Sequence, residues 1–309
     1  MIEVRNLTKD YGSRRAIDSL NFSVNKGEVV GFLGPNGAGK STTMKIITGF
    51  MAPSGGQALV AGFDVFEEPL EVKRRIGYLP ENPPVYGEMF VKEYLEFVAN
   101  LKGVEKSRIS KLVQQSIEKT NLGQVQNRLI QNLSKGFRQR VGIAQALVSD
   151  PDVLILDEPT VGLDPKQVAE IRDLIKELRG QHTIILSTHI LPEVEATCER
   201  IIIINQGKIV AQESLSNIGA MAKGARQVTF RIRRNSDELI GRLLALSGVI
   251  NVVKGATPNT VIAEFNGQDE VIENLSSEVV RAGAGLLEMH SQAQLEDVFI
   301  KLTYGSVDQ

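Results

Sequence analysis

The sequence predicts an α/β fold, with a mixed-sheet core and a helical subdomain, followed by a small α+β domain. Continuous apolar runs at 153–156 and 183–186 are bounded by polar turns, which is typical of central parallel strands covered on both faces. Between about 88 and 149 the apolar residues recur at helical spacing instead. Beyond a Ser-, Gly- and Ala-rich stretch at 214–226, which we interpret as a linker, the pattern is strand-helix-strand-strand-helix-strand, as in ferredoxin-like domains. The predicted domains are 1–217 and 218–309.

The individual elements follow from apolar patterning. Alternation of apolar and polar residues predicts half-buried strands near the N-terminus, and a short apolar run that ends in glycines predicts a buried strand before the helix Lys40–Ile47. The turn Asn205-Gln206-Gly207 joins two short apolar segments and predicts a hairpin. The strands of the first domain are expected at 2–4, 20–24, 28–33, 76–79, 153–156, 183–186, 201–204 and 208–210. In the second domain, strands are expected at 228–232, 249–253, 261–265 and 285–289, and helices at 237–246, 269–282 and 295–302.

The composition is that of a folded chain. Of its 309 residues, 42% are apolar and 23% are charged, which excludes global disorder. The net charge of -2 provides no overall basic field for nucleic acid. No apolar run approaches the roughly 20 residues that cross a bilayer, and the first twelve residues carry charges where a signal peptide has an apolar core. The single cysteine, Cys198, fits a reducing compartment, so we expect a cytoplasmic protein without a membrane span of its own.

A phosphate-binding loop is predicted at 34–41, where GPNGAGKS fits the pattern G-x-x-x-x-G-K-[ST] between a strand and a helix. Its glycines let backbone N–H groups turn toward phosphate oxygens, and the helix N-terminus adds partial positive charge. Lys40 can reach the β- and γ-phosphates, and the Ser41 hydroxyl can bind Mg²⁺. A Gly-rich turn that only caps a helix is the disfavoured alternative, because strand and helix both flank the motif. The predicted nucleotide ligands here are Gly34, Pro35, Asn36, Gly37, Ala38, Gly39, Lys40, Ser41 and Thr42.

Two acidic residues, Asp157 and Glu158, stand where the apolar run at 153–156 ends. In open α/β sheets, ligands bind outside the carboxyl ends of the strands. We therefore expect Asp157 to hold Mg²⁺, directly or through water, and Glu158 to polarise the attacking water. A strand that merely ends in solvated acids is the common alternative, and it is disfavoured because a phosphate loop requires a metal-binding acid after another strand.

A third segment, Leu133-Ser134-Lys135-Gly136-Phe137, lies about twenty residues before Asp157. With it, the chain resembles an ATP-binding-cassette (ABC) ATPase over about residues 1–217. Ser134 and Gly136 match the family signature, whereas Lys135 and Phe137 replace its commonest Gly and Gln. The resemblance implies that Ser134 and Gly136 cap the ATP of a second copy in a head-to-tail dimer. Ser134 can also be the N-cap of its helix, and the two roles are compatible.

The resemblance implies further site residues. Tyr11 matches the aromatic residue that stacks on adenine, and alone it would be read as a packing tyrosine. Asp164 matches the loop that crosses the dimer interface, although Asp before Pro165 is also a good helix N-cap. His189 matches the histidine that contacts the γ-phosphate, while His182 and His290 are interpreted as incidental. The expected catalytic residues are therefore Glu158, His189 and Lys40.

One departure concerns the metal. The family usually places Gln after the strand expected at 76–79, where this chain has Glu81. A carboxylate still offers an oxygen ligand, but it adds negative charge beside ATP. The predicted Mg²⁺ ligands are Ser41, Glu81 and Asp157. Some export-type members share this glutamate, which favours that branch.

The resemblance implies an ATP-hydrolysing subunit on the cytoplasmic face of a membrane, where a dimer of this chain drives a separate permease, with export favoured. The segment 83–90 is a candidate groove for a permease helix, or equally a loop packed on its own domain. The second domain resembles extensions of export-type ABC ATPases, but methionine-import ATPases also carry a ferredoxin-like, ligand-sensing tail. A soluble ABC ATPase acting on ribosomes or DNA, and a GTPase-like switch, are competing interpretations. No nucleic acid is expected, because the one basic cluster reads as a solvated strand face; it comprises Arg226, Arg231, Arg233 and Arg234.

Overall fold

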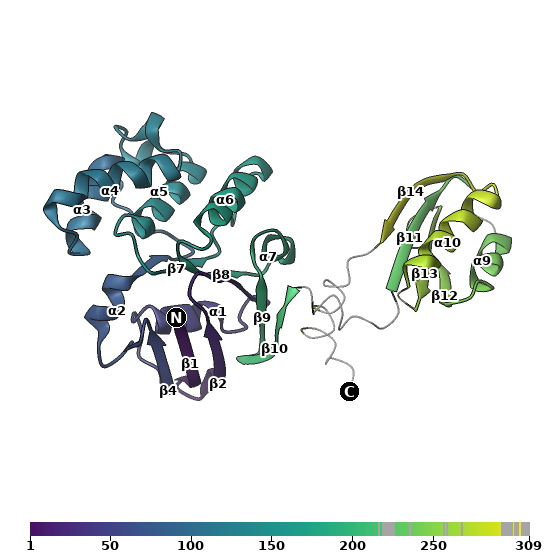
Figure 1. The fold of residues 1–309 in the computed structure, drawn as a ribbon, viewed down its shortest axis with the longest axis horizontal. Coiled ribbons are helices and arrows are strands. Elements are labelled where there is room, and N and C mark those ends of the chain that lie inside the picture. Colours follow the sequence, from purple (N-terminus) through teal and green to yellow (C-terminus); the bar gives the residue numbers. More distant parts are fainter. Residues whose placement is uncertain are drawn as a thin grey trace. The chain divides into compact units, whose positions relative to one another are not determined.

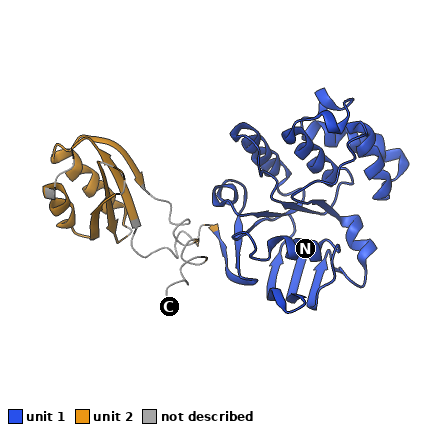
Figure 2. Cartoon of the chain, turned by 180° about the vertical axis from the view of Figure 1, so that it is seen from behind, with its two compact units in different colours: residues 1–214 blue, residues 215–309 orange. Residues whose placement is uncertain are grey.

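The computed structural model divides the chain into two compact units, 1–214 and 215–309, each considered by itself (Figure 2). Most of the expected linker and all but residue 299 of the final helix expected at 295–302 lie outside the described residues. No helix in the described part of the chain is both long and apolar enough to cross a bilayer. The described residues are 1–215, 217, 226–234, 237–255, 257, 259–266, 268–291, 299 and 303.

The core of unit 1 is a six-stranded sheet in the order β10-β9-β3-β8-β7-β6, of which β7, β8, β9 and β10 are labelled in Figure 1. Five of its strands are parallel, and β10 pairs antiparallel with β9 as the expected hairpin. Every residue of β3, β7 and β8 is buried, which explains why these strands read as continuous apolar runs. The parallel strands bring their carboxyl ends to one edge of the sheet. The bounds are β3 Val29–Leu33, β6 Ile76–Leu79, β7 Val153–Asp157, β8 Thr183–Thr188, β9 Arg200–Asn205 and β10 Lys208–Ser214.

A second, antiparallel sheet in unit 1 has the order β2-β1-β4-β5. Its strands β1 and β2 extend well beyond the short segments expected from alternation, because register shifts interrupt the pairing and break the alternating pattern. Helix α1, Lys40–Ile47, has the predicted bounds and shares one core with both sheets, in which the rings of Phe22 and Phe32 lie 5.6 Å apart. The bounds are β1 Ile2–Tyr11, β2 Arg14–Val24, β4 Gly55–Val60 and β5 Phe63–Asp64.

The expected helical region forms a subdomain with its own core. The N-caps considered from the sequence are present: the Ser134 hydroxyl accepts from the Phe137 N–H, and the Asp164 carboxylate accepts from the Gln167 N–H at 2.9 Å. Two seven-residue helices, α2 and α7, were not expected, since each is too short to show a helical period. Besides α1, the α-helices of unit 1 are α2 Pro69–Arg75, α3 Val91–Leu101, α4 Lys106–Lys119, α5 Lys135–Leu147, α6 Pro165–Leu178 and α7 Leu191–Thr197, of which α3, α4 and α5 lie in the subdomain.

Unit 2 has the expected strand-helix-strand-strand-helix-strand order, with an antiparallel sheet ordered β12-β13-β11-β14. Helices α9 and α10 contribute apolar side chains to the same core as Phe230 and Phe265 of that sheet. Arg231 is exposed and ion-paired with Glu288 on the neighbouring strand, as suits a solvated strand face. The bounds are β11 Arg226–Ile232, α9 Asp237–Leu244, β12 Val249–Lys254, β13 Thr260–Phe265, α10 Asp269–Arg281 and β14 Leu286–Ser291.

Candidate nucleotide-binding site

The parallel sheet of unit 1 assembles the site, because four of its strands each lead into a segment predicted to bind nucleotide. The phosphate loop follows β3, and Glu81 follows β6. Glu158 follows β7, and His189 follows β8. These four strands are consecutive neighbours in the order β3-β8-β7-β6, so the segments that follow them meet at one edge.

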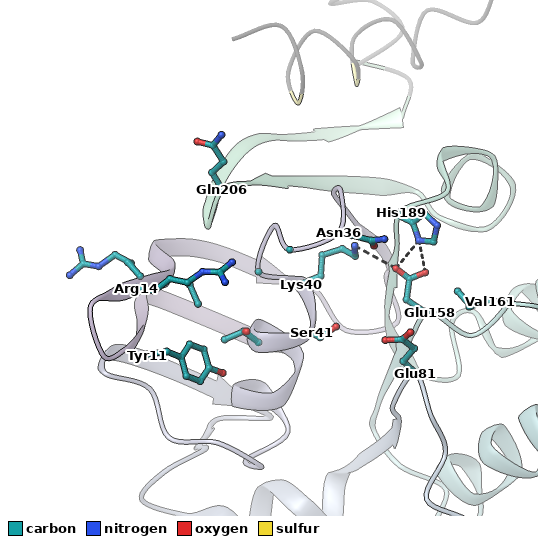
Figure 3. A pocket seen from close by; sticks show the side chains of 15 residues that line it. Tyr11, Arg14, Asn36, Lys40, Ser41, Glu81, Glu158, Val161, His189 and Gln206 are labelled. Atoms are coloured by element: carbon teal, nitrogen blue, oxygen red, sulfur yellow. Dashed lines mark hydrogen bonds and ion pairs between the residues drawn. The ribbon is translucent and has the colours of Figure 1, made fainter. Parts of the chain in front are cut away.

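A cavity of about 810 Å³ opens at this edge (Figure 3). It unites ten of the residues predicted from the sequence: Tyr11 ends β1 of the antiparallel sheet, and the other nine come from α1 and from the loops after the parallel strands. Gly34, Pro35 and Ala38 belong to the same loop but do not line the cavity, and Asp157 is buried beside it. The ten lining residues are Tyr11, Asn36, Gly37, Gly39, Lys40, Ser41, Thr42, Glu81, Glu158 and His189.

The phosphate loop needs glycine for two different reasons. At Gly34 a Cβ atom would lie 2.3 Å from the Ile204 carbonyl oxygen, so only glycine fits against β9. Gly39 has φ +110° and caps α1, a conformation that side chains rarely adopt. No side chain caps α1, so the N–H groups of its first turn are free for an anion.

Lys40 extends across the loop toward the acidic side of the cavity (Figure 3). Its ammonium donates to the Gly34 carbonyl at 2.7 Å and lies 3.4 Å from a Glu158 carboxylate oxygen. Both side chains are almost completely buried, so the pair is shielded from solvent. A phosphate that entered the cavity would meet this ammonium at the mouth of the loop.

Glu158 occupies an unusual backbone position, with φ +51°. Its N–H donates to the Ser187 carbonyl at 2.8 Å, which ties this turn to the end of β8. Its carboxylate oxygens lie 2.9 and 3.0 Å from Nδ1 of His189, whose side chain is 39% exposed. The strained backbone aims a buried carboxylate into the cavity and against an accessible imidazole.

Asp157 is the deeper of the two acids, only 2% exposed. Burial raises the pKa of this carboxyl above its ordinary value, and hydrogen bonds from Ser187 and Ser41 oppose the rise. The Ser187 hydroxyl donates at 2.7 Å. Asp157 and Ser41, two of the predicted metal ligands, are thus neighbours, and the third, Glu81, is exposed on the cavity wall.

Tyr11 lies at the opposite end of the cavity from Glu158 (Figure 3). The residue is 46% exposed, its hydroxyl lies 3.0 Å from the Met51 sulfur, and the Lys9 ammonium lies 5.6 Å from the ring centroid. An exposed aromatic ring held in this way provides a surface on which a planar base could stack.

The signature residues do not join this cavity. Gly136 and Asp164 line a second cavity of about 350 Å³ between α5 and α6, and Ser134 is exposed at the start of α5. At Gly136 a Cβ atom would lie 2.5 Å from Oε1 of Gln167, so the two helix N-termini are packed closely. Within one chain, the structure therefore does not bring the signature segment to the phosphate loop.

Several lining residues were missed by the sequence analysis. Arg14 and Arg15 could have been found as two adjacent cations just beyond Tyr11, but no motif marked them. Of the histidines interpreted as incidental, His182 is buried with its Nδ1 2.7 Å from the Pro151 carbonyl, away from the cavity. The additional lining residues are Arg14, Arg15, Ala16, Val161 and Gln206.

The sequence matches the family described as ABC transporter over residues 17–161. It is 39% identical to the bacitracin transport ATP-binding protein BcrA of Bacillus licheniformis, over 69% of each chain. It is 32% identical to the daunorubicin/doxorubicin resistance ATP-binding protein DrrA of Streptomyces peucetius, over 98% of this chain and 92% of that protein. A solved dimeric structure of MJ0796, a bacterial ABC transporter cassette, matches with a TM-score of 0.64 at 28% identity, covering 70% of this chain and 99% of that one. The chain therefore belongs to the ABC transporter family, as an ATP-binding subunit that hydrolyses ATP.

Proposed function

We propose that two copies of this chain close head to tail around ATP and thereby drive a separate membrane permease. The observation that carries the proposal is the separation of two half-sites within one chain. The phosphate loop lines one cavity, whereas Gly136 and Asp164 line another. A nucleotide in the first cavity could meet a signature segment only if a second copy supplied it.

The chemistry follows from the side chains at the sheet edge. Lys40 binds the terminal phosphates and offsets their negative charge as the bond to the γ-phosphate breaks. Glu158 accepts the proton of the attacking water, and its buried setting holds the carboxylate in place. His189 contacts the γ-phosphate and, through Nδ1, fixes the orientation of Glu158. Tyr11 stacks on the adenine, and Asp164 crosses to the other copy.

Mg²⁺ fits this donor set, because Ser41, Asp157 and Glu81 offer the oxygen atoms that it prefers. In the described part of the chain, no three acidic, histidine or cysteine side chains could hold a metal ion alone. The remaining ligands would be phosphate oxygens and water. Bound there, the ion would neutralise charge on the phosphates and on Glu81, which stands where the family resemblance implies a neutral glutamine.

A disulfide trap tests the composite site. An Asn36→Cys variant is mixed with a Ser134→Cys variant, with ATP and a mild oxidant, and the products are separated on a non-reducing gel. A covalent dimer is expected with ATP, because Asn36 lines one half-site and Ser134 is exposed at the other. The native Cys198 is buried and does not interfere. Ser107→Cys, exposed on α4, is the matched control, and equal crosslinking from it would count against the composite site.

Export is the direction that we propose. BcrA is named for bacitracin transport and DrrA for daunorubicin/doxorubicin resistance, and DrrA matches nearly the whole of this chain. The ferredoxin-like order of unit 2 also suits an importer ATPase with a ligand-sensing tail, which is the second candidate. In either case the chain would lie on the cytoplasmic face, held there by its permease.

The permease contact is proposed at the segment 83–90. Tyr86 is 56% exposed although its ring packs edge-on against Tyr94 and Phe97, and Phe90 is 48% exposed. The segment is thus anchored on the helical subdomain while it keeps apolar surface open.

A photoreactive residue at Tyr86 should crosslink to an integral membrane protein in membranes of the source cells, because the exposed aromatic surface faces the proposed partner. The same label at Lys176, exposed on α6, is the control. Labels at Tyr86 that never reach a membrane protein, on samples that do co-sediment with the membrane, would rule out this docking segment.

A further inference from the structure

The most unusual buried group outside the cavity is the carboxylate of Glu193, in the first turn of α7. Only 2% of the residue is exposed. One carboxylate oxygen accepts a hydrogen bond from the Thr160 hydroxyl, and the other accepts from the Thr188 hydroxyl at 2.8 Å. Thr160 and Thr188 are themselves 4% and 0% exposed, so the three side chains form a dry polar cluster.

The cluster joins the two loops that carry the groups proposed for hydrolysis. Thr160 lies two residues after Glu158, and Thr188 directly precedes His189. The Thr188 hydroxyl also accepts from the Ile190 N–H at 3.1 Å, which fixes the backbone on the far side of His189. The same two segments also meet at the cavity, where Nδ1 of His189 lies 2.9 Å from a Glu158 carboxylate oxygen. Glu193 therefore links, through Thr160 and Thr188, the two segments that carry Glu158 and His189.

The residue that links the two segments is a carboxylate, and this limits the contacts that it can make. A carboxylate only accepts hydrogen bonds and has two oxygens, so it can bind two hydroxyl donors at once, one from each loop. Both hydrogen-bond partners of its carboxylate are hydroxyl groups rather than cations. A buried carboxylate held in this way adds little to the stability of the fold, since apolar side chains of similar volume would stabilise it as well or better. Its effect is on geometry, because both hydrogen bonds form only when Thr160 and Thr188 each lie within reach of the same carboxylate.

We propose that Glu193 is a positioning residue for ATP hydrolysis, which sets the distance and orientation between Glu158 and His189 by holding Thr160 and Thr188 together. The inference rests on the roles proposed above for Glu158 and His189. Catalysis is sensitive to such spacing, because a misplacement of about 1 Å can lower a rate by about 10²-fold. Nucleotide binding should not depend on the cluster itself, since none of Thr160, Thr188 and Glu193 lines the cavity.

The test separates turnover from binding. Thr160→Val removes one donor while it keeps the shape of the side chain, and it should lower kcat for ATP on the order of tenfold with an unchanged KM. Thr160→Ser keeps the hydroxyl and should restore kcat. Thr197→Val is the matched control, because Thr197 is equally buried but donates to the backbone carbonyl of Glu193, at 2.6 Å, and not to its carboxylate. Equal loss of kcat in Thr197→Val would mean that α7 packing is responsible, and would overturn the proposal.

Glu193→Gln gives a second arm that does not depend on Thr160. It should lower kcat in the wild-type background but add little further loss in a His189→Ala background, since both changes disturb the same pair. Fully additive losses would show that Glu193 acts elsewhere. If Glu158→Gln abolishes turnover while Thr160→Val and Glu193→Gln retain normal kcat, the positioning role is wrong and the proposed chemistry stands. If Glu158→Gln itself turns over normally, the proposed chemistry is what fails.

Discussion

Replacing Glu158 with glutamine is expected to lower the turnover number for ATP by about 10²–10⁴-fold, the range for loss of a general base. The amide keeps the size of the side chain but cannot accept the proton of the attacking water. Because the carboxylate is ion-paired with His189 and Lys40 at the cavity, and the amide keeps its size, the fold and the nucleotide cavity should persist. Single-turnover hydrolysis with radiolabelled ATP, beside sizing chromatography with ATP, measures both effects, and the variant should accumulate as an ATP-bound dimer.

Glu177→Gln is the control for Glu158→Gln, because Glu177 is an exposed glutamate on α6 and far less constrained. It should hydrolyse ATP like the unmodified chain. Turnover of Glu158→Gln within threefold of that control would remove Glu158 as the proton acceptor and leave the buried neighbour Asp157 as the acid to examine.

Lys40→Ala is expected to weaken ATP binding by about 1.5–3 kcal/mol, the range for hydrogen bonds to charged groups. That loss corresponds to a rise of roughly 10- to 150-fold in Kd. The ammonium lies where the loop faces the cavity, between the Gly34 carbonyl and the Glu158 carboxylate, whereas Arg14 and Arg15 line the cavity from β2. Isothermal titration with a slowly hydrolysed ATP analogue measures the change directly.

Two further variants interpret the Lys40 result. Lys45→Ala, in the last turn of the same helix, removes a lysine that does not line the cavity and should bind ATP normally. Lys40→Met keeps the length of the side chain without its charge, so it separates the lost charge from the lost packing. An unchanged Kd in both Lys40 variants would contradict the assigned role.

The central sheet and α1 were predicted from the sequence because their signals are local. A strand buried on both faces reads as an apolar run, and the phosphate loop is contiguous, so 153–156, 183–186 and Lys40–Ile47 were all placed correctly. Strand β4 was missed because Gly55 and Gly56 open it without an alternating pattern, and β5 was missed because its two residues are too few to show one. Membership of the ABC transporter family was likewise predicted and is confirmed, since it depended on motifs in a fixed order.

The walls of the cavity could not be read from the sequence in the same way. Arg14 and Gln206 reach the cavity because β2 and the β9–β10 turn fold over the phosphate loop, which is a tertiary event. The cluster of Thr160, Thr188 and Glu193 could not be predicted from the sequence for the same reason, since its members come from separate elements and none belongs to a motif. The roles of the individual site residues remain predictions until the variants above are made.

The contact between Lys40 and Glu158 has a consequence for the order of events. The two groups carry opposite charges and lie 3.4 Å apart, and both are shielded from water. In the proposed mechanism a phosphate arriving at Lys40 takes the place of that carboxylate, so substrate entry and release of the base are a single exchange reaction. In such an enzyme Glu158 would become available as the base only when ATP has bound to Lys40.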